Sequence, residues 1–190
     1  MSVNQLSAKN YQLFSDYHTH PQGHRVQRYT QALLQPWADS ARRLGLTDIA
    51  FTDHDRYHAG IDFNEIDRLR ERNPDLRIRA GIELDNDPIH SAAGRNWIEK
   101  HWDKLDFVRA RNLAVELSTA GWRKPVNELY PGNRIIELAM EKGIFFTTAS
   151  DAHSHAQLGD NFPRLAQTMA NFGIHQVCIF EKHNRGQLQL

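Results

Sequence analysis

Short strand-like segments alternate with amphipathic helix-like segments along most of this chain, and this alternation constrains its fold more than any other feature. Strands that are joined by helical crossovers pair in parallel, because each helix returns the chain to the same end of the sheet. A chain of 190 residues, 40% of them apolar, is long enough to bury one substantial core. We therefore expect a single α/β domain over residues 1–190, with no internal repeat and no linker.

The expected strands are short apolar runs between turn residues, and the expected helices carry apolar residues at spacings of three and four. Strands are predicted at 11–18, 47–54, 76–84, 112–120, 144–153 and 175–183. Helices are predicted at 28–44, 62–72, 95–104, 133–143 and 162–172. Gly45 should end the first helix, Asp62 should begin the second, and Asn133 and Gly143 should bound the fourth.

Charge and apolar patterning exclude several classes of protein. Lys plus Arg and Asp plus Glu both number 23, with a sequence pI near 7.2, which argues against a nucleic-acid partner and against a membrane surface. No apolar run approaches the roughly 20 residues of a membrane span, and residues 1–10 lack the apolar core of a signal peptide. We expect a cytoplasmic protein. Its one cysteine, Cys178, lies in an apolar run and should be a buried, unreactive thiol.

The first predicted strand leads into the motif "DYHTHPQGH" (16–24), which contains His18, His20 and His24. Residues i and i+2 of a strand point to the same face, so His18 and His20 should lie side by side. His24 could return to them from the loop that follows. Three imidazoles in so short a segment favour a metal site, although a chain with 11 histidines can also contain this spacing by chance.

The ends of the other predicted strands strengthen the metal hypothesis. In order along the chain, the polar residues at or near strand ends are His18 and His20, Asp53 and His54, Glu83, Glu116, and Asp151 with His153. The carboxyl ends of parallel strands meet on one face, where functional residues gather. Burying an unpaired carboxylate costs several kcal/mol, so a purely structural role for the whole set is disfavoured. Imidazole and carboxylate ligands suit Zn²⁺, Mn²⁺ or Fe, and such ions promote hydrolysis.

Four of these motifs resemble, in order, those of the PHP (polymerase and histidinol phosphatase) superfamily. They are "DYHTHPQGH" (16–24), "FTDHD" (51–55), "GIELD" (81–85) and "ASDAHSH" (149–155). The segment "VELSTAGWRKPVNELYPG" (115–132) resembles the one that histidinol-phosphate phosphatases of this superfamily carry before their last metal motif. The resemblance covers about residues 12–160. It implies a distorted parallel β/α barrel, here with fewer strands than the usual seven, which binds up to three divalent metals.

The resemblance also implies which residues bind the metals. One site would consist of His18, His20, Glu83 and Asp151, with Glu83 able to bridge to a neighbouring ion. The other would consist of His24, His54 and His153. Asp53 would orient the cluster by contacting a ligand, although a strand-end hydrogen bond would also explain it. Asp53, His54 and Arg123 are also our candidate catalytic residues.

The middle of the chain departs from the superfamily pattern. Family members usually supply further histidine ligands from two strands between the glutamate motif and the segment that here reads "VELSTAG", but this chain has only residues 84–115 in that interval. His90 and His101 are the only histidines there, and neither follows a typical strand end. We therefore expect one or two bound metals, within a possible range of one to three.

Arg123 and Lys124 would bind a substrate phosphate if the likeness to phosphatases extends to substrate binding, because Arg can hold a phosphate bidentately. The alternative is that the two are a solvated loop pair. Glu116 is equally consistent with a structural hydrogen-bond acceptor and with a site residue.

The leading functional prediction is a metal-dependent phosphatase that hydrolyses a small phosphomonoester through a metal-activated water. Histidinol phosphate is the first candidate substrate, which would place the protein in histidine biosynthesis. One alternative is a phosphodiesterase or exonuclease of the same superfamily. The other is a metal-binding module with reduced catalysis, and the sequence indicates no oligomeric state.

Overall fold

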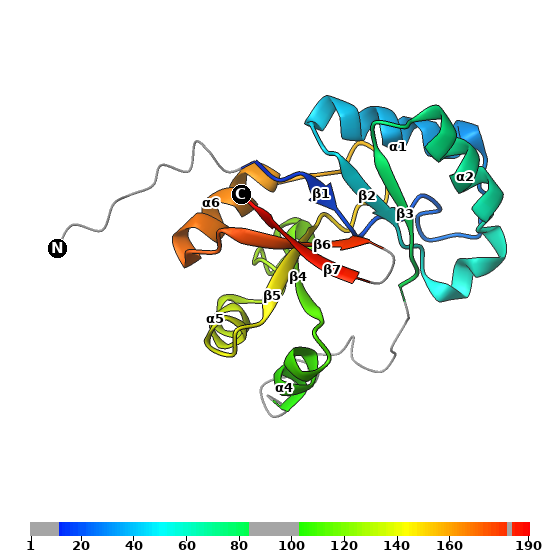
Figure 1. Ribbon diagram of the computed structural model, residues 1–190. Coiled ribbons are helices and arrows are strands. Elements are labelled where there is room, and N and C mark those ends of the chain that lie inside the picture. Colours follow the sequence, from blue (N-terminus) through cyan, green and yellow to red (C-terminus); the bar gives the residue numbers. More distant parts are fainter. Residues whose placement is uncertain (1–11, 84–102, 182–183) are drawn as a thin grey trace.

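A computed structural model describes residues 12–83, 103–181 and 184–190, and it is a mixed α/β fold with parallel sheets (Figure 1). The strands are β1 (Ser15–Asp16), β2 (Asp48–Phe51), β3 (Arg77–Ala80), β4 (Ala114–Ser118), β5 (Phe145–Ala149), β6 (Gln176–Glu181) and β7 (Asn184–Gln189). The α-helices are α1 (Gln31–Leu44), α2 (Phe63–Arg72), α4 (Asp103–Ala110), α5 (Asn133–Glu141) and α6 (Phe162–Phe172). Two 3₁₀ helices, η2 (Asp55–Gly60) and η3 (Thr119–Arg123), follow β2 and β4.

The first five strands form two groups, and the strands within each group pair in parallel. The two groups meet where the end of β1 contacts β5. β2 lies between β1 and β3, and β4 pairs with β5, all in parallel. The N–H of Tyr17 donates to the carbonyl of Thr148 (3.2 Å), and a parallel bridge pairs Thr19 with Ala152. The chain therefore leaves the carboxyl ends of β1, β2, β3 and β5 close together, as the strand–helix alternation predicts.

The expectation that every strand pairs in parallel is wrong for the last two. β6 and β7 form an antiparallel hairpin, with Gln176 opposite Gln189. Only residues 182–183 separate these strands, and a connection this short permits antiparallel pairing alone, whereas a parallel pair needs a crossover. The sequence of β7, "NRGQLQ", is so polar that it gave no strand signal.

Most helix boundaries follow the capping residues. The Thr30 hydroxyl accepts from the N–H of Leu33 (3.2 Å) at the start of α1, and Gly45 ends that helix with φ +72°. Asp62 caps α2 as predicted, by accepting from the N–H of Asn64 (3.0 Å).

Two helix predictions need correction. Asn133 is the first residue of α5 rather than its cap, because Gly132 occupies the capping position and provides no side-chain hydrogen bond. The helix predicted at 95–104 lies mostly outside the described residues, and α4 continues past its predicted end to Ala110.

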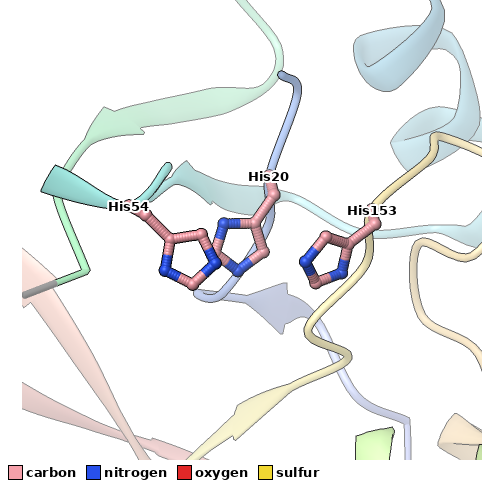
Figure 2. Close-up of side chains that lie close together, drawn as sticks. All are labelled: His20, His54 and His153. Carbon is pink, nitrogen blue, oxygen red and sulfur yellow. The ribbon is translucent and has the colours of Figure 1, made fainter. Parts of the chain in front are cut away.

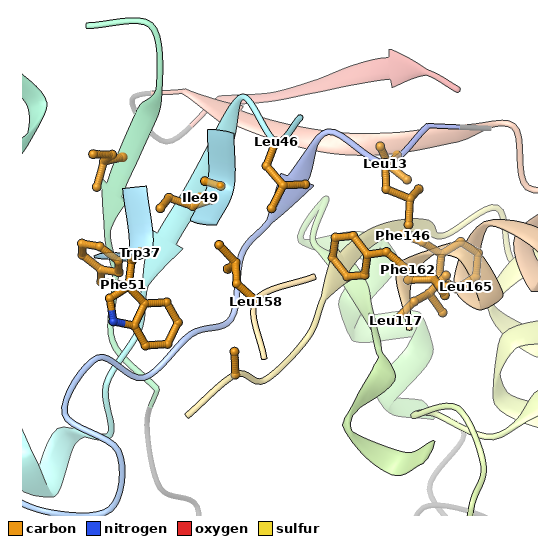
Figure 3. Packing of buried hydrophobic residues seen from close by; sticks show 14 of the residues in the cluster. Leu13, Trp37, Leu46, Ile49, Phe51, Leu117, Phe146, Leu158, Phe162 and Leu165 are labelled. Atoms are coloured by element: carbon orange, nitrogen blue, oxygen red, sulfur yellow. The ribbon is translucent and has the colours of Figure 1, made fainter. Parts of the chain in front are cut away.

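The core lies between the sheets and the helices that cover them (Figure 3). Trp37 of α1 is only 2% exposed and meets Phe51 of β2 edge-on, with ring centroids 6.2 Å apart. Cys178 is buried, as predicted. Phe145 is only half-buried and lies beneath the guanidinium of Arg185, 4.4 Å from its ring centroid.

Among the described helices, none combines the length and the apolar character that crossing a membrane would require.

Candidate metal centre

Backbone hydrogen bonds hold the predicted ligand segments together at the carboxyl ends of the strands. The N–H of Thr19 donates to the hydroxyl of Thr52 (3.0 Å), which ties the end of β1 to the end of β2. The N–H of His20 donates to the carbonyl of Ala152 (2.8 Å), which ties β1 to the segment after β5. A parallel bridge pairs His54 with Glu83. These contacts bring together segments that are far apart in the sequence.

His18 lies between two carboxylates. Its Nδ1 is 2.8 Å from Glu116 Oε1, and its Nε2 is 3.1 Å from Glu83 Oε2 and 3.9 Å from Asp151 Oδ1. Burial lowers the pKa of His18, but its hydrogen bonds to Glu116 and Glu83 outweigh burial and raise it to about 11. The surrounding carboxylates thus favour positive charge at this position, which a proton on the ring or a divalent metal bound to it would supply.

His20 is fully buried at the centre of the cluster. Its ring stacks between His54 and His153, with centroid distances of 4.6 and 4.4 Å (Figure 2). Its Nε2 approaches Asp151 Oδ1 to 3.1 Å and Glu83 Oε2 to 3.4 Å. Neither approach has the geometry of a hydrogen bond, and neither ring nitrogen of His20 has a hydrogen-bond partner within the described ranges.

A buried imidazole nitrogen without a hydrogen-bond partner is costly, and a metal ion would satisfy it. Two sets of donor atoms lie close enough together to hold an ion, each with its atoms within 4.8 Å of one another. They are His20, His54 and His153, and His18, His20 and Glu83. Glu83 Oε2 also lies 3.1 Å from His54 Nδ1, so one carboxylate oxygen contacts both sets. The donor atoms that are present therefore fit a divalent metal of the zinc or manganese type.

The predicted division into two sites differs from this geometry in three respects. His20, assigned to one site, belongs to both sets of donor atoms. Asp151, assigned to the same site, belongs to neither set, although its Oδ1 lies 3.1 Å from His20 Nε2. His24, assigned to the other, is exposed and absent from both sets, although its ring centroid lies 4.1 Å from that of His153.

The surroundings of the cluster shift the pKa values of its two carboxylates and of His153. Burial raises the pKa values of Asp151 and Glu83, but neighbouring histidines outweigh it and lower both below their usual range. Burial and the charge of His20 lower the pKa of His153 to about 4. The carboxylates are therefore ionised and His153 is neutral at pH 7, which are the forms in which these groups bind metals.

Asp53 is buried behind the cluster. Its carboxylate accepts from the Tyr29 hydroxyl (2.7 Å) and from the N–H of Gln22 (3.2 and 3.3 Å to its two oxygens), and it lies 3.8 Å from His20 Nδ1. Burial raises its pKa. Contact with the ring of a predicted ligand suits an orienting role, while the strand-end hydrogen bond to Gln22 is present as well.

The two predicted phosphate-binding residues have different surroundings. Arg123 Nη2 donates to the carbonyls of Ser150 (2.7 Å) and Asp151 (2.8 Å), and Nη1 reaches Asp160 Oδ2 at 3.5 Å. Arg123 thus supports the backbone that carries Asp151. Lys124 is exposed. Their binding of a phosphate stays a prediction.

The sequence alone does not reveal what Glu116 and Asp16 contact. Glu116, equally consistent with a structural and a site role in the sequence, contacts His18 directly. Asp16 was not singled out, yet its buried carboxylate accepts from the N–H groups of Ser150 (2.9 Å) and Gly159 (3.0 Å), and burial raises its pKa to about 6. Its position two residues before His18, at the end of a strand, was the available signal. His90 and His101, the two histidines of the short interval 84–115, lie outside the described residues.

Comparison with known proteins yields relatives of one kind, while no family model matches the chain. A probable histidinol-phosphatase from Deinococcus radiodurans is 36% identical over 104 residues, covering 55% of this chain and 35% of that protein. A probable histidinol-phosphatase from Schizosaccharomyces pombe is 33% identical over 67 residues, covering 35% of this chain and 22% of that protein. The chain thus matches about a third or less of the length of these curated relatives.

The fold has a solved counterpart. A histidinol phosphate phosphatase from Lactococcus lactis, crystallised with zinc, L-histidinol and phosphate, aligns with a TM-score of 0.64 and 14% identity, over 90% of this chain and 98% of that one. At this identity the likeness concerns the fold alone. The sequence relatives confirm the predicted resemblance of this chain to histidinol-phosphatases.

Proposed function

We propose that this chain is a metal-dependent phosphatase that hydrolyses a small phosphomonoester, with histidinol phosphate as the first substrate to test. The observation that carries the proposal is the gathering of imidazoles and carboxylates around the buried His20, whose ring nitrogens have no hydrogen-bond partner within the described ranges. The names of the relatives support the same activity, and the Lactococcus lactis structure contains zinc, histidinol and phosphate.

The proposed metals are Zn²⁺, Mn²⁺ or Fe, one to three in number. His18, His20, Glu83 and Asp151 would hold one ion. His54 and His153 would hold another, together with His20, and His24 could reach it from the exposed side. When bound, these ions supply the positive charge that activates water and neutralises phosphoryl oxygens.

The chain's own residues would prepare this reaction. Water adds to phosphorus as the ester P–O bond breaks; the alcohol oxygen takes up a proton from that water, and inorganic phosphate leaves. His54, beside Glu83, is proposed to carry a proton, and Asp53 to keep the His20 ring in its orientation. Arg123 and Lys124 are proposed to attract the phosphate, Arg123 also by supporting the backbone of Asp151.

The test is elemental analysis of protein expressed with added metal, followed by release of phosphate from histidinol phosphate. His20→Ala and Asp151→Asn should each abolish hydrolysis with an unchanged far-UV circular dichroism spectrum. His175→Ala, an exposed histidine away from the cluster, should leave activity intact. Less than a tenth of a metal equivalent, or full activity in either site variant, would refute the proposal.

We also propose the finer features that the resemblance implies. They are a distorted parallel β/α barrel with fewer strands than the usual seven, a single domain over residues 1–190, and a cytoplasmic location.

A further inference from the structure

A cavity of about 570 Å³ opens beside two of the predicted metal ligands, His24 and His153. Its walls come from the loop 21–27, from the first half of α1 and from the segment after β5. A cavity of similar size, about 580 Å³, lies between η3 and α6, and no predicted metal ligand lines it. The first cavity, which we call the α1 cavity, is therefore the one of the two that could place a ligand against the cluster.

The walls of the α1 cavity differ in chemistry. Leu33, Pro36 and Trp37 of α1 form an apolar wall. The other lining residues include His24, His153 and Arg25, the residue after His24. A pocket of several hundred Å³ with an apolar wall and a few polar groups is typical of a small-molecule site.

Arg25 differs from Arg123 in how its guanidinium is used. Arg123 donates to two backbone carbonyls and reaches a carboxylate. Arg25 is exposed, and its side chain makes no hydrogen bond or ion pair with any residue in the described part of the chain. Arg25 therefore has its donors available for an anion, and Arg is the side chain best suited to bind a phosphoryl group.

We propose that the α1 cavity binds the substrate of the proposed phosphatase, with the phosphoryl group between the histidine cluster and Arg25 and the alcohol part against the apolar wall of α1. This inference rests on the proposed function for the identity of the reaction. The contacts that it assigns concern only the binding of the ligand. It favours phosphomonoesters of alcohols with a flat or branched carbon group that can contact Leu33, Pro36 and Trp37. It makes Arg25 a substrate-binding residue and α1 the element that sets specificity.

The two halves of the cavity can be tested separately by titration calorimetry on the manganese-loaded protein. Phenylphosphonate, which cannot be hydrolysed at an ester bond, probes both the apolar wall and the anion site. Inorganic phosphate probes the anion site alone. Neither measurement depends on turnover.

Ala32→Trp fills the cavity from an exposed position in the first turn of α1. Binding of phenylphosphonate should become at least about tenfold weaker, while binding of phosphate changes less than about twofold. Ala110→Trp, the same change at an exposed position of α4 outside the cavity, is the matched control. If Ala32→Trp does not fold, Ala32→Phe takes its place. Unchanged phenylphosphonate binding in the folded variant would overturn the assignment of the wall.

Arg25→Gln should weaken both ligands by about 10- to 100-fold, since it removes charge-assisted hydrogen bonds to an anion. Arg109→Gln, an exposed arginine of α4, is its control. Metal content must match that of the unaltered protein. Equal affinities in Arg25→Gln and the control would overturn the role of Arg25.

The outcomes separate this inference from the proposed function. If no phosphomonoester is hydrolysed but both variants weaken binding as expected, the cavity is a ligand site and the phosphatase proposal fails. If hydrolysis occurs but Ala32→Trp and Arg25→Gln bind both ligands normally, the phosphatase proposal stands and the cavity does not hold the substrate.

Discussion

The contact between Glu116 and His18 predicts a measurable effect on metal affinity. A carboxylate on Nδ1 leaves Nε2 directed at Glu83, and such partners typically change metal affinity by about 10- to 100-fold. Glu116→Ala should weaken zinc binding by that amount, as measured by competition with a chromophoric chelator. Glu116→Gln keeps an oxygen that can accept from Nδ1–H and should restore most of the affinity. Equal zinc affinity in the alanine variant and the unaltered protein would assign Glu116 no part in the site.

For Arg123, a role in supporting Asp151 and a role in binding the substrate predict different results. Its bonds to the carbonyls of Ser150 and Asp151 should be worth about 1.5–3 kcal/mol, so Arg123→Ala should lower the free energy of unfolding by that order. It should also weaken metal binding, because Asp151 loses its support. Urea unfolding and elemental analysis measure the two effects. A variant with normal stability and metal content but a raised KM would show that Arg123 acts on the substrate alone.

At the scale of elements, the start of α1 is sensitive because that helix supplies both Trp37 and one wall of the α1 cavity. Thr30→Ala removes the hydroxyl that accepts from the N–H of Leu33 and should destabilise the protein by about 1 kcal/mol. Thr30→Ser keeps the acceptor and should retain nearly full stability in thermal unfolding. If serine is no better than alanine at this position, the cap is not what stabilises α1.

The elements that the sequence predicts well are those whose signals are local. Asp62 marks the beginning of α2 because its side chain bonds the backbone two residues on, and Gly45 ends α1 because it adopts a positive φ. β7 could not be predicted in this way. It has few apolar residues, and its formation depends on pairing with β6 rather than on its own composition.

The features of the candidate site also divide into those that the sequence predicts and those that it does not. His18, His20, Glu83 and Asp151 could be placed together in advance because they end strands that a parallel sheet brings to one face. Spacing along the chain could not reveal that His20 stacks between His54 and His153, or that Arg25 rather than Arg123 keeps its donors available. Those facts depend on the directions of side chains, which only the three-dimensional packing determines.

For the whole molecule, the metal cluster should contribute to stability, because its predicted ligands come from the ends of β1, β2, β3 and β5. A ligand that binds only the folded chain adds about 2.7 kcal/mol when its concentration is 100 times its dissociation constant. Removing metal with a chelator should therefore lower the melting temperature by several degrees, and added Zn²⁺ or Mn²⁺ should restore it. In His20→Ala the melting temperature should no longer respond to metal. A response equal to that of the unaltered protein would locate the bound metal elsewhere.

His20 belongs to both donor sets, and Glu83 Oε2, a member of one set, lies 3.1 Å from His54 Nδ1 of the other, which affects how the site fills with metal. Two ions that draw on the same imidazole and the same oxygen cannot load independently, because the first to arrive changes the donors left for the second. A metal titration should then show two unequal steps, with a partly filled protein accumulating between them. A substitution of Glu83 should shift both steps together. A substitution of His153, which belongs to one set, should shift only one of the two steps.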